Sequence, residues 1–156
     1  MSYGVIEVYT DGGARGNGGD NCISAWAYTL RSGDLKKEDK GVVIGATNNQ
    51  MEMTAIIKAL QAIKKKDIPI KIHSDSAYCI NGITSWIHGW KKNGWINSKK
   101  QQVENKELWM EMDKLVSECP FIEFIKVKGH ADCEGNIRVD KLVNIAMDEV
   151  NKSEEE

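Results

Sequence analysis

The fold is decided by the stretch VIEVYT (Val5–Thr10) and the glycine-rich DGGARGNGG (Asp11–Gly19) that follows it directly. Val5–Thr10 is predicted to form a strand, which the glycines then break. A second strand is predicted over Cys22–Leu30, and the RSGD of Arg31–Asp34 is typical of a hairpin turn. With a weaker third strand over about Gly41–Ile44, this part of the chain predicts an antiparallel meander.

Farther along the chain, the hydrophobic period changes to that of amphipathic helices. Apolar residues recur at helical spacing from Met51 to Ile63, which predicts a helix over about Asn49–Lys65. The remaining predicted elements are strands over Ile70–Ser74 and Phe121–Val127, and helices over Ser76–Ile83, Thr84–Lys91, Lys106–Glu118 and Arg138–Val150. Because these later strands alternate with helices, parallel crossovers are expected. The sequence thus predicts an α/β fold with a mixed sheet, antiparallel strands followed by parallel ones, flanked by helices.

The composition is that of one ordinary globular domain. Hydrophobic residues make up 41% and charged residues 28% of the 156 residues, which excludes a disordered or membrane-spanning chain. One domain over residues 1–150 is predicted, followed by an acidic, disordered tail over residues 151–156. The formal net charge of −2 argues against binding nucleic acid through bulk positive charge.

Neither a secretory signal nor an apolar run of the ~20 residues that span a membrane is visible, which predicts a cytoplasmic protein with no membrane partner. The four cysteines lie far apart, with no CxxC pair and no histidine at zinc-site spacing. Reduced thiols are therefore expected rather than a zinc site or a disulfide framework. No long apolar seam indicates an obligate dimer, so a monomer is predicted.

Four acidic residues occupy unusual places, although each has an ordinary structural explanation. Asp11 precedes a glycine, which is typical of a turn, and Asp75 follows a predicted strand, where aspartate commonly caps a helix. Glu52 lies three residues after Asn49, the spacing of a capping box. Asp140 falls in the first turn of a predicted helix, where an acid favours the helix dipole.

The joint placement of these carboxylates favours a second explanation. Asp11 and Asp75 both follow strands that the topology places side by side, at the edge of the sheet where sites gather in α/β folds. Glu52 shares a helix face with apolar residues, and burying a carboxylate there is costly unless something compensates it. With Asp140 they would form a hard-cation site that suits Mg²⁺ or Mn²⁺ rather than zinc.

His130 lies in the polar segment KGHADCEGN, between two glycines. A single loop histidine is most often a surface residue. The flanking glycines and the nearby carboxylates favour a catalytic role instead.

Six motifs carry a resemblance to a known family. They are YTDGGARGNGG, TNNQMEMTA, SDSAYCINGI, WIHGWKKNGW, KGHADCEGN and RVDKLVN, in this order along the chain. Along essentially its whole length, the chain resembles ribonuclease H of type 1, the bacterial-like catalytic domain. The resemblance implies the ribonuclease H-like fold, with a five-stranded mixed sheet.

The resemblance also implies an activity and a set of catalytic residues. Asp11, Glu52, Asp75 and Asp140 would hold two Mg²⁺ ions, with Mn²⁺ as a substitute, and His130 would be the histidine that assists proton transfer or product departure. The family cleaves the RNA strand of an RNA–DNA hybrid endonucleolytically, leaving 5′-phosphate and 3′-hydroxyl ends.

Residues that bind the hybrid are implied in the same way. Asn17, Asn48 and Gln50 would line the RNA groove, where amides can donate to and accept from a 2′-hydroxyl. Gly12 and Gly13 would let the backbone approach closely. Turn and cap roles are the structural alternatives for the two asparagines. The remaining residues of this implied set are Asn136 for substrate, and Thr47 and Asn105 for a DNA phosphate.

A basic segment over Trp86–Lys106 matches the family's protrusion that grips the DNA strand. It contains Trp86, Trp90 and Trp95 together with Lys91, Lys92, Lys99, Lys100 and Lys106. Five lysines against the single Glu104 give the segment a net charge of +4, which the near-neutral total conceals. Tryptophans that pack on sugars and lysines that pair with phosphates suit a nucleic-acid backbone. The alternative is a solvated charged helix over a tryptophan-rich core.

Some positions depart from the family pattern. Gly45 stands where an arginine can lie near the DNA phosphate, Ala77 where a glutamine can contact the minor groove, and Gly18 where a proline is frequent. Asp132 and Glu134 add acids beside His130.

Three other functions remain open at this point. They are a non-catalytic module on the same fold that binds hybrid or double-stranded RNA, another metal-dependent nuclease, and a structural domain whose acids only cap helices.

Overall fold

The computed structural model describes residues 4–15, 22–127 and 134–155. Its elements are β1 (Ile6–Arg15), β2 (Ile23–Ser32), β3 (Leu35–Ile44), α1 (Asn48–Ala62), β4 (Ile70–Ser74), α2 (Ala77–Asn81), the π-helical turn η1 (Gly82–Trp86), α3 (Ile87–Lys92), α4 (Lys106–Ser117), β5 (Ile122–Lys126) and α5 (Glu134–Glu155). None of the described helices is both long and apolar enough to cross a membrane.

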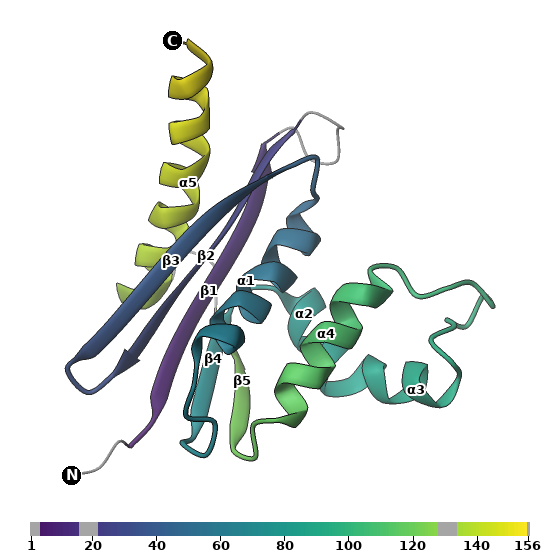
Figure 1. The fold of residues 1–156 in the computed structure, drawn as a ribbon. Helices are drawn as coiled ribbons and strands as arrows, with labels where there is room; N and C mark the ends of the chain where they lie inside the picture. Colours follow the sequence, from purple (N-terminus) through teal and green to yellow (C-terminus); the bar gives the residue numbers. More distant parts are fainter. Residues whose placement is uncertain (1–3, 16–21, 128–133, 156) are drawn as a thin grey trace.

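The five strands form one mixed sheet in the order β3-β2-β1-β4-β5 (Figure 1). β1 pairs antiparallel with β2, and β2 with β3, whereas β1–β4 and β4–β5 are parallel. This confirms the predicted fold class. The parallel β1–β4 pair places the residues that follow Tyr9 and His73, which are register partners, at the same edge of the sheet.

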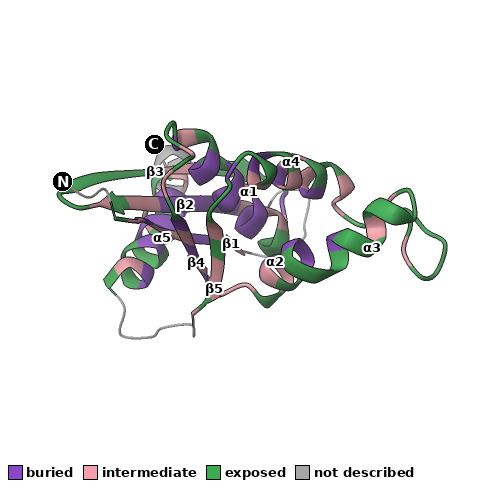
Figure 2. Ribbon diagram, turned by 90° about the horizontal axis from the view of Figure 1, so that it is seen from below, coloured by how far each residue is buried: buried purple, intermediate pink, exposed green. Residues whose placement is uncertain are grey.

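Helices cover both faces of the sheet, and a hydrophobic core lies beneath each layer (Figures 1 and 2). The larger core joins β1 and β4 to α1 and α4, with Trp109 of α4 fully buried at one end. On the opposite face, α5 packs on Ala25 and Ala27 of β2, whose small side chains let the helix approach closely. α3 and the segment after it project from this body as a separate arm (Figure 2).

Two strands of the antiparallel part of the sheet, β1 and β3, are longer than the sequence predicts. β1 continues to Arg15 because its glycine-rich part stays paired with β2, so Asp11 lies inside the strand and not at its end, where we expected it. β3 spans Leu35–Ile44 instead of beginning near Gly41. Its lysines and acids conceal the strand pattern, but charged residues are common on an edge strand, whose outer side faces water.

The helices differ from prediction at their ends. α5 begins at Glu134 rather than Arg138 and continues to Glu155, past the expected boundary at Val150. The two short helices predicted after β4 are one continuous helical segment, α2–η1–α3, with a π-helical turn in the middle. This turn begins at Gly82, where a side chain would meet the ring of Trp109, at 2.0 Å from its Cη2 atom. Glycine therefore lets the helical segment pack directly on the buried tryptophan.

Candidate active site

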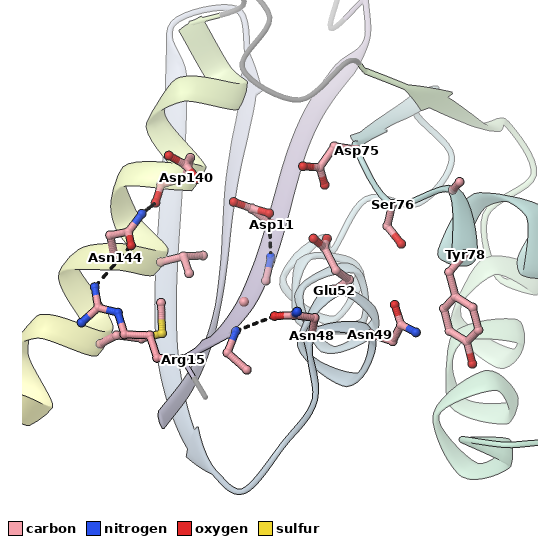
Figure 3. Close-up of a pocket in the computed structure, with 16 residues that line it drawn as sticks. Asp11, Arg15, Asn48, Asn49, Glu52, Asp75, Ser76, Tyr78, Asp140 and Asn144 are labelled. Atoms are coloured by element: carbon pink, nitrogen blue, oxygen red, sulfur yellow. Dashed lines mark hydrogen bonds between the residues drawn. The ribbon is translucent and has the colours of Figure 1, made fainter. Parts of the chain in front are cut away.

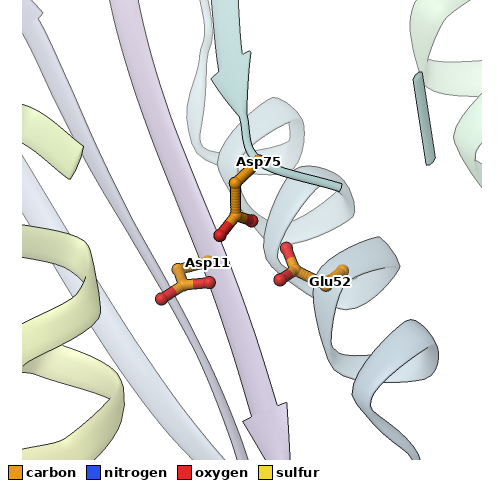
Figure 4. Close-up of side chains that lie close together, drawn as sticks. All are labelled: Asp11, Glu52 and Asp75. Carbon is orange, nitrogen blue, oxygen red and sulfur yellow. The ribbon is translucent and has the colours of Figure 1, made fainter. Parts of the chain in front are cut away.

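Three carboxylates gather where β4 ends and β1 continues. Asp11 comes from β1, Asp75 follows β4 directly, and Glu52 reaches the same point from the sheet-facing side of α1 (Figure 4). One oxygen atom of each side chain lies within 4.8 Å of one oxygen of the other two. The register explains this proximity, because Asp11 and Asp75 each follow the paired residues Tyr9 and His73 by two positions. The predicted convergence of these three residues is thus observed.

The structural explanations for these acids do not hold. α1 is capped by Thr47, whose side chain accepts from the backbone N–H of Gln50. The side chain of Gln50 in turn accepts from the backbone N–H of Thr47. Glu52 therefore has no part in the capping box. α2 is capped by Ser76 and not by Asp75. Asp11 lies within a strand and not in a turn. These carboxylates therefore have no capping or turn role that would account for their positions.

Asp140 approaches the cluster from the other face of the sheet. It lies in the second turn of α5, beyond the first turn where a helix dipole acts strongly. Its side chain is exposed and lies on the side of Asp11 that faces α5 (Figure 3). It lines the same cavity of about 640 Å³ as the three clustered carboxylates, although it is not within the 4.8 Å group. Asn144 stabilises this turn by donating to the Asp140 carbonyl at 3.0 Å.

Burial and mutual repulsion dominate the electrostatics of the site. Burial, followed by the charge of Asp75, raises the pKa of Asp11 to about 6, and Asp140 adds a smaller effect in the same direction. Burial raises the pKa of Glu52 well above its usual value, and the charge of Asp11 raises it further. Within the described residues, the buried Oε2 atom of Glu52 has no hydrogen-bond partner. A cluster of this kind is unfavourable unless a cation compensates it.

The donor set fits a hard divalent cation. Every donor is a carboxylate oxygen, and the cluster contains neither sulfur nor imidazole, so Mg²⁺ or Mn²⁺ suits it better than Zn²⁺. The Glu52 carboxylate points towards Asp11 and Asp75 (Figure 4), and a cation bound among the three acids would satisfy its unpartnered oxygen.

The raised pKa of Asp11 predicts an unusual pH dependence of stability in the absence of metal. Asp11 is protonated below about pH 6 in the folded protein but only below about 3.8 in the unfolded chain. The folded state therefore binds a proton more tightly, and its stability increases as the pH falls from 7 through 6 towards 4. We expect the melting temperature in EDTA to rise by several degrees over this range. In Asp11→Asn the rise should be smaller, and an identical rise in both proteins would contradict the assignment.

Of the predicted groove residues that the structure describes, Asn48 lines the cavity, whereas the half-buried Gln50 is not among its lining residues. Asn48 accepts a hydrogen bond from the backbone N–H of Ala14 at 2.6 Å, which leaves its amide N–H groups available to a ligand. Asn136 is buried and lines a smaller cavity with Asp11, Asp75 and Asp140. Asn17 and His130 lie outside the described residues.

The basic segment forms the projecting arm. Trp86 is exposed, whereas Trp90 and Trp95 are half-buried, with ring centroids 6.0 Å apart for Trp86–Trp90 and 6.4 Å for Trp90–Trp95. Trp90 also packs on the buried Trp109 at 5.4 Å. Trp90 therefore packs against the core, whereas Trp86 is available on the surface of the arm. The four lysines assigned to substrate are all exposed, namely Lys91, Lys92, Lys99 and Lys100.

Tyr78 and Arg15 are among the cavity residues that the predicted site lacks. Tyr78 lies on α2 three residues after Asp75, and this helical spacing from a candidate ligand was the available signal. Arg15 lies at the end of β1 and pairs with Asp148 of α5 at 2.8 Å. Nothing in the local sequence indicates this contact, because the partner is more than a hundred residues away.

The structure is thus an α/β protein with a mixed sheet, a carboxylate cluster between its central strand β1 and the neighbouring β4 that could hold a divalent cation, and a basic aromatic arm. The family model for RNase H matches residues 4–148. The chain is 48% identical over 147 residues to "Ribonuclease H" of Clostridium botulinum, an alignment that covers 94% of this chain and 97% of the relative. It is 45% identical over 149 residues to "Ribonuclease H" of Acetivibrio thermocellus, covering 95% and 96%. The chain belongs to the ribonuclease H family.

Solved structures agree with this assignment. The crystal structure of LC9-RNase H1, described as a type 1 RNase H with the type 2 active-site motif, superposes with a TM-score of 0.82 at 25% identity. The match covers 94% of this chain and 74% of that one. The recognised resemblance is therefore confirmed in sequence and in fold.

Proposed function

We propose that this protein hydrolyses the RNA strand of RNA–DNA hybrids endonucleolytically, with 5′-phosphate and 3′-hydroxyl products. The observation that carries this proposal is the cluster of Asp11, Glu52 and Asp75, which lie within 4.8 Å of one another in a protein of the ribonuclease H family. Asp140 completes the set from α5.

The carboxylates would hold two Mg²⁺ ions, for which Mn²⁺ could substitute. Asp11 lies with Glu52 and Asp75 on one side and Asp140 on the other (Figure 3), so it would help to hold both ions. Two such ions, when bound, activate a water molecule and stabilise the leaving 3′-oxygen.

The cysteine nearest the carboxylates is unsuited to attack the substrate as a covalent nucleophile, and other residues are assigned to proton transfer and substrate contact. Cys79 is the cysteine nearest the cluster in sequence, but it is fully buried, and burial raises the pKa of its thiol to about 12. It is therefore a poor nucleophile. We assign proton transfer or product departure to His130, RNA-groove contacts to Asn17, Asn48 and Gln50, and a substrate contact to Asn136, as the family resemblance implies.

The arm provides the second contact surface, for the DNA strand. Trp86 and Lys100 line a hollow of about 460 Å³ on it, together with the half-buried Trp90. An aromatic surface with a lysine rim suits a sugar–phosphate backbone, because the rings pack on sugars and the lysines pair with phosphates. We infer that the hybrid spans from this arm to the carboxylates.

Strand-specific cleavage tests the proposal. With end-labelled RNA–DNA hybrid and Mg²⁺, we expect cleavage of the RNA strand alone, no cleavage of duplex DNA or duplex RNA, and no reaction in EDTA. Mass spectrometry of the fragments should show 5′-phosphate and 3′-hydroxyl ends. Binding of the hybrid without metal-dependent cleavage would favour the alternative of a non-catalytic binding module. Cleavage of duplex DNA would indicate a different metal-dependent nuclease.

A further inference from the structure

A chain of hydrogen bonds links the start of α1 to α2 through the start of α4. Gln50 accepts from the backbone N–H of Thr47 at 2.9 Å and donates from Nε2 to Oδ1 of Asn105 at 3.2 Å. Asn105 in turn donates from Nδ2 to the hydroxyl oxygen of Tyr78 at 3.1 Å. The last two contacts join residues 55 and 27 positions apart in the sequence.

The backbone N–H of Thr47 fixes which group donates and which accepts in each of these hydrogen bonds. A backbone N–H can only donate, so Thr47 requires the carbonyl oxygen of Gln50 and turns its amide group towards Asn105. That amide group requires an acceptor, so Asn105 presents its own oxygen to Gln50 and its NH₂ group to Tyr78. One N–H of Asn105 remains unused in these bonds. These hydrogen bonds therefore leave Asn105 with an N–H that can donate to a ligand, and such a donor suits an anion.

The backbone of Asn105 frees its side chain for this role. Asn105 is the N-cap residue of α4 but has a left-handed conformation, with φ of +60°, and its side chain makes no capping bond. A residue at this position usually bonds its own helix. Here the half-buried carboxamide instead bridges Gln50 and Tyr78.

Tyr78 connects this position to the catalytic cluster. It lies on α2 three residues after Asp75 and lines the same cavity as the carboxylates. Its ring is held between Trp109, with centroids 5.2 Å apart, and Trp86, at 6.0 Å. A rigid ring of this kind places its hydroxyl group without a further loss of side-chain freedom.

We propose that Tyr78 and Gln50 are positioning residues, which hold the carboxamide of Asn105 with an N–H directed at a phosphate of the DNA strand. This inference rests on the proposed function, and it adds two residues to which no role in DNA binding has been given. It also reassigns Gln50, whose carboxamide oxygen and one amide N–H are occupied within the chain, from groove contact to support.

Tyr78→Phe isolates the hydroxyl group, because the ring and its packing remain. We expect KM for the hybrid to rise about two- to tenfold, the range for one lost hydrogen bond, with kcat and the melting temperature close to wild type. The matched control is Tyr28→Phe on β2, whose ring stacks on Trp26 at 6.1 Å and has no contact with this chain of bonds. It should leave KM unchanged.

A modified substrate distinguishes positioning from a general structural effect. Single neutral methylphosphonates are placed in turn along the DNA strand of the hybrid. Wild type should show a raised KM at each linkage whose phosphate the protein contacts, and Tyr78→Phe should show a smaller penalty than wild type at one of these linkages only. Asn105→Asp cannot donate from its side chain, so the double variant with Tyr78→Phe should bind no worse than Asn105→Asp alone.

The outcomes separate this inference from the proposed function. If wild type cleaves the hybrid but Tyr78→Phe has an unchanged KM, or if the two substitutions are additive, the positioning role is wrong and the function stands. If wild type fails to cleave the hybrid, the proposed function is wrong.

Discussion

Asp11→Asn is expected to lower the rate of hybrid cleavage in Mg²⁺ by about 10³-fold or more, corresponding to about 4 kcal/mol of lost transition-state stabilisation. Asp11 is the acid of the cluster that lies nearest Asp140, with Glu52 and Asp75 on its other side (Figure 3). An amide has nearly the same shape, but it carries no charge and is a weak ligand for a hard cation. Single-turnover cleavage of a labelled hybrid measures the loss.

The same substitution is expected to stabilise the metal-free protein. Burial and the charge of Asp75 oppose ionisation of Asp11, so removing its charge relieves both effects at pH 7. Asp67→Asn, at an exposed position after α1, is the matched control and should change neither rate nor stability. Near-normal cleavage by Asp11→Asn would contradict the whole site assignment. A decrease in melting temperature in EDTA would contradict the electrostatic part alone.

The acids were recognisable in the sequence because burying their charges costs stability, which a function in metal binding would explain. Each had an acceptable local role, and Asn49 with Glu52 even matched the spacing of a capping box. The neighbouring pair Thr47 and Gln50 fits the same pattern and forms the real box. Two overlapping patterns cannot be separated by spacing, because the choice depends on which side of α1 faces the sheet. Glu52 could be identified only jointly with Asp11 and Asp75, through the parallel topology.

The features that escaped prediction depend on tertiary contacts. β1 was predicted to end at its glycines, since glycine weakens an isolated strand, yet pairing with β2 carries the strand to Arg15. The left-handed Asn105 and its bonds to Gln50 and Tyr78 join segments far apart in sequence. The helical and strand periods report only which face of an element is buried. They do not report which polar group from a distant element will meet it.

Gly12→Ala is expected to damage both stability and activity, although alanine is only one methyl group larger. A Cβ atom at Gly12 would lie 2.3 Å from the backbone carbon of Met51 and 2.4 Å from the backbone nitrogen of Glu52. Neither atom belongs to a flexible side chain, so α1 must move away from β1. We expect a loss of about 3 kcal/mol, or a melting temperature lower by roughly 6–12 °C.

Gly13→Ala is the matched control for the effect on folding. The neighbouring glycine faces α5 rather than α1, and its added Cβ would lie 3.6 Å from the Val143 side chain, an ordinary contact. Its stability should stay within about 0.5 kcal/mol of wild type. The family resemblance implies the same role for both glycines, which is to let the backbone approach the substrate closely. The structure separates them, because Gly12 is where α1 touches the central strand.

The activity loss in Gly12→Ala follows from the backbone and not from any lost side chain. The displaced atoms belong to Met51 and Glu52, so the shift moves the Glu52 carboxylate away from Asp11 and Asp75. Stabilisation by added Mg²⁺, measured as the change in melting temperature, should therefore shrink in Gly12→Ala and persist in Gly13→Ala. A folded Gly12→Ala protein with the full Mg²⁺ response would show that the shift of α1 leaves the Glu52 carboxylate close enough to Asp11 and Asp75 to bind the ion. The close contact at Gly12 would then be a packing requirement only, independent of metal binding.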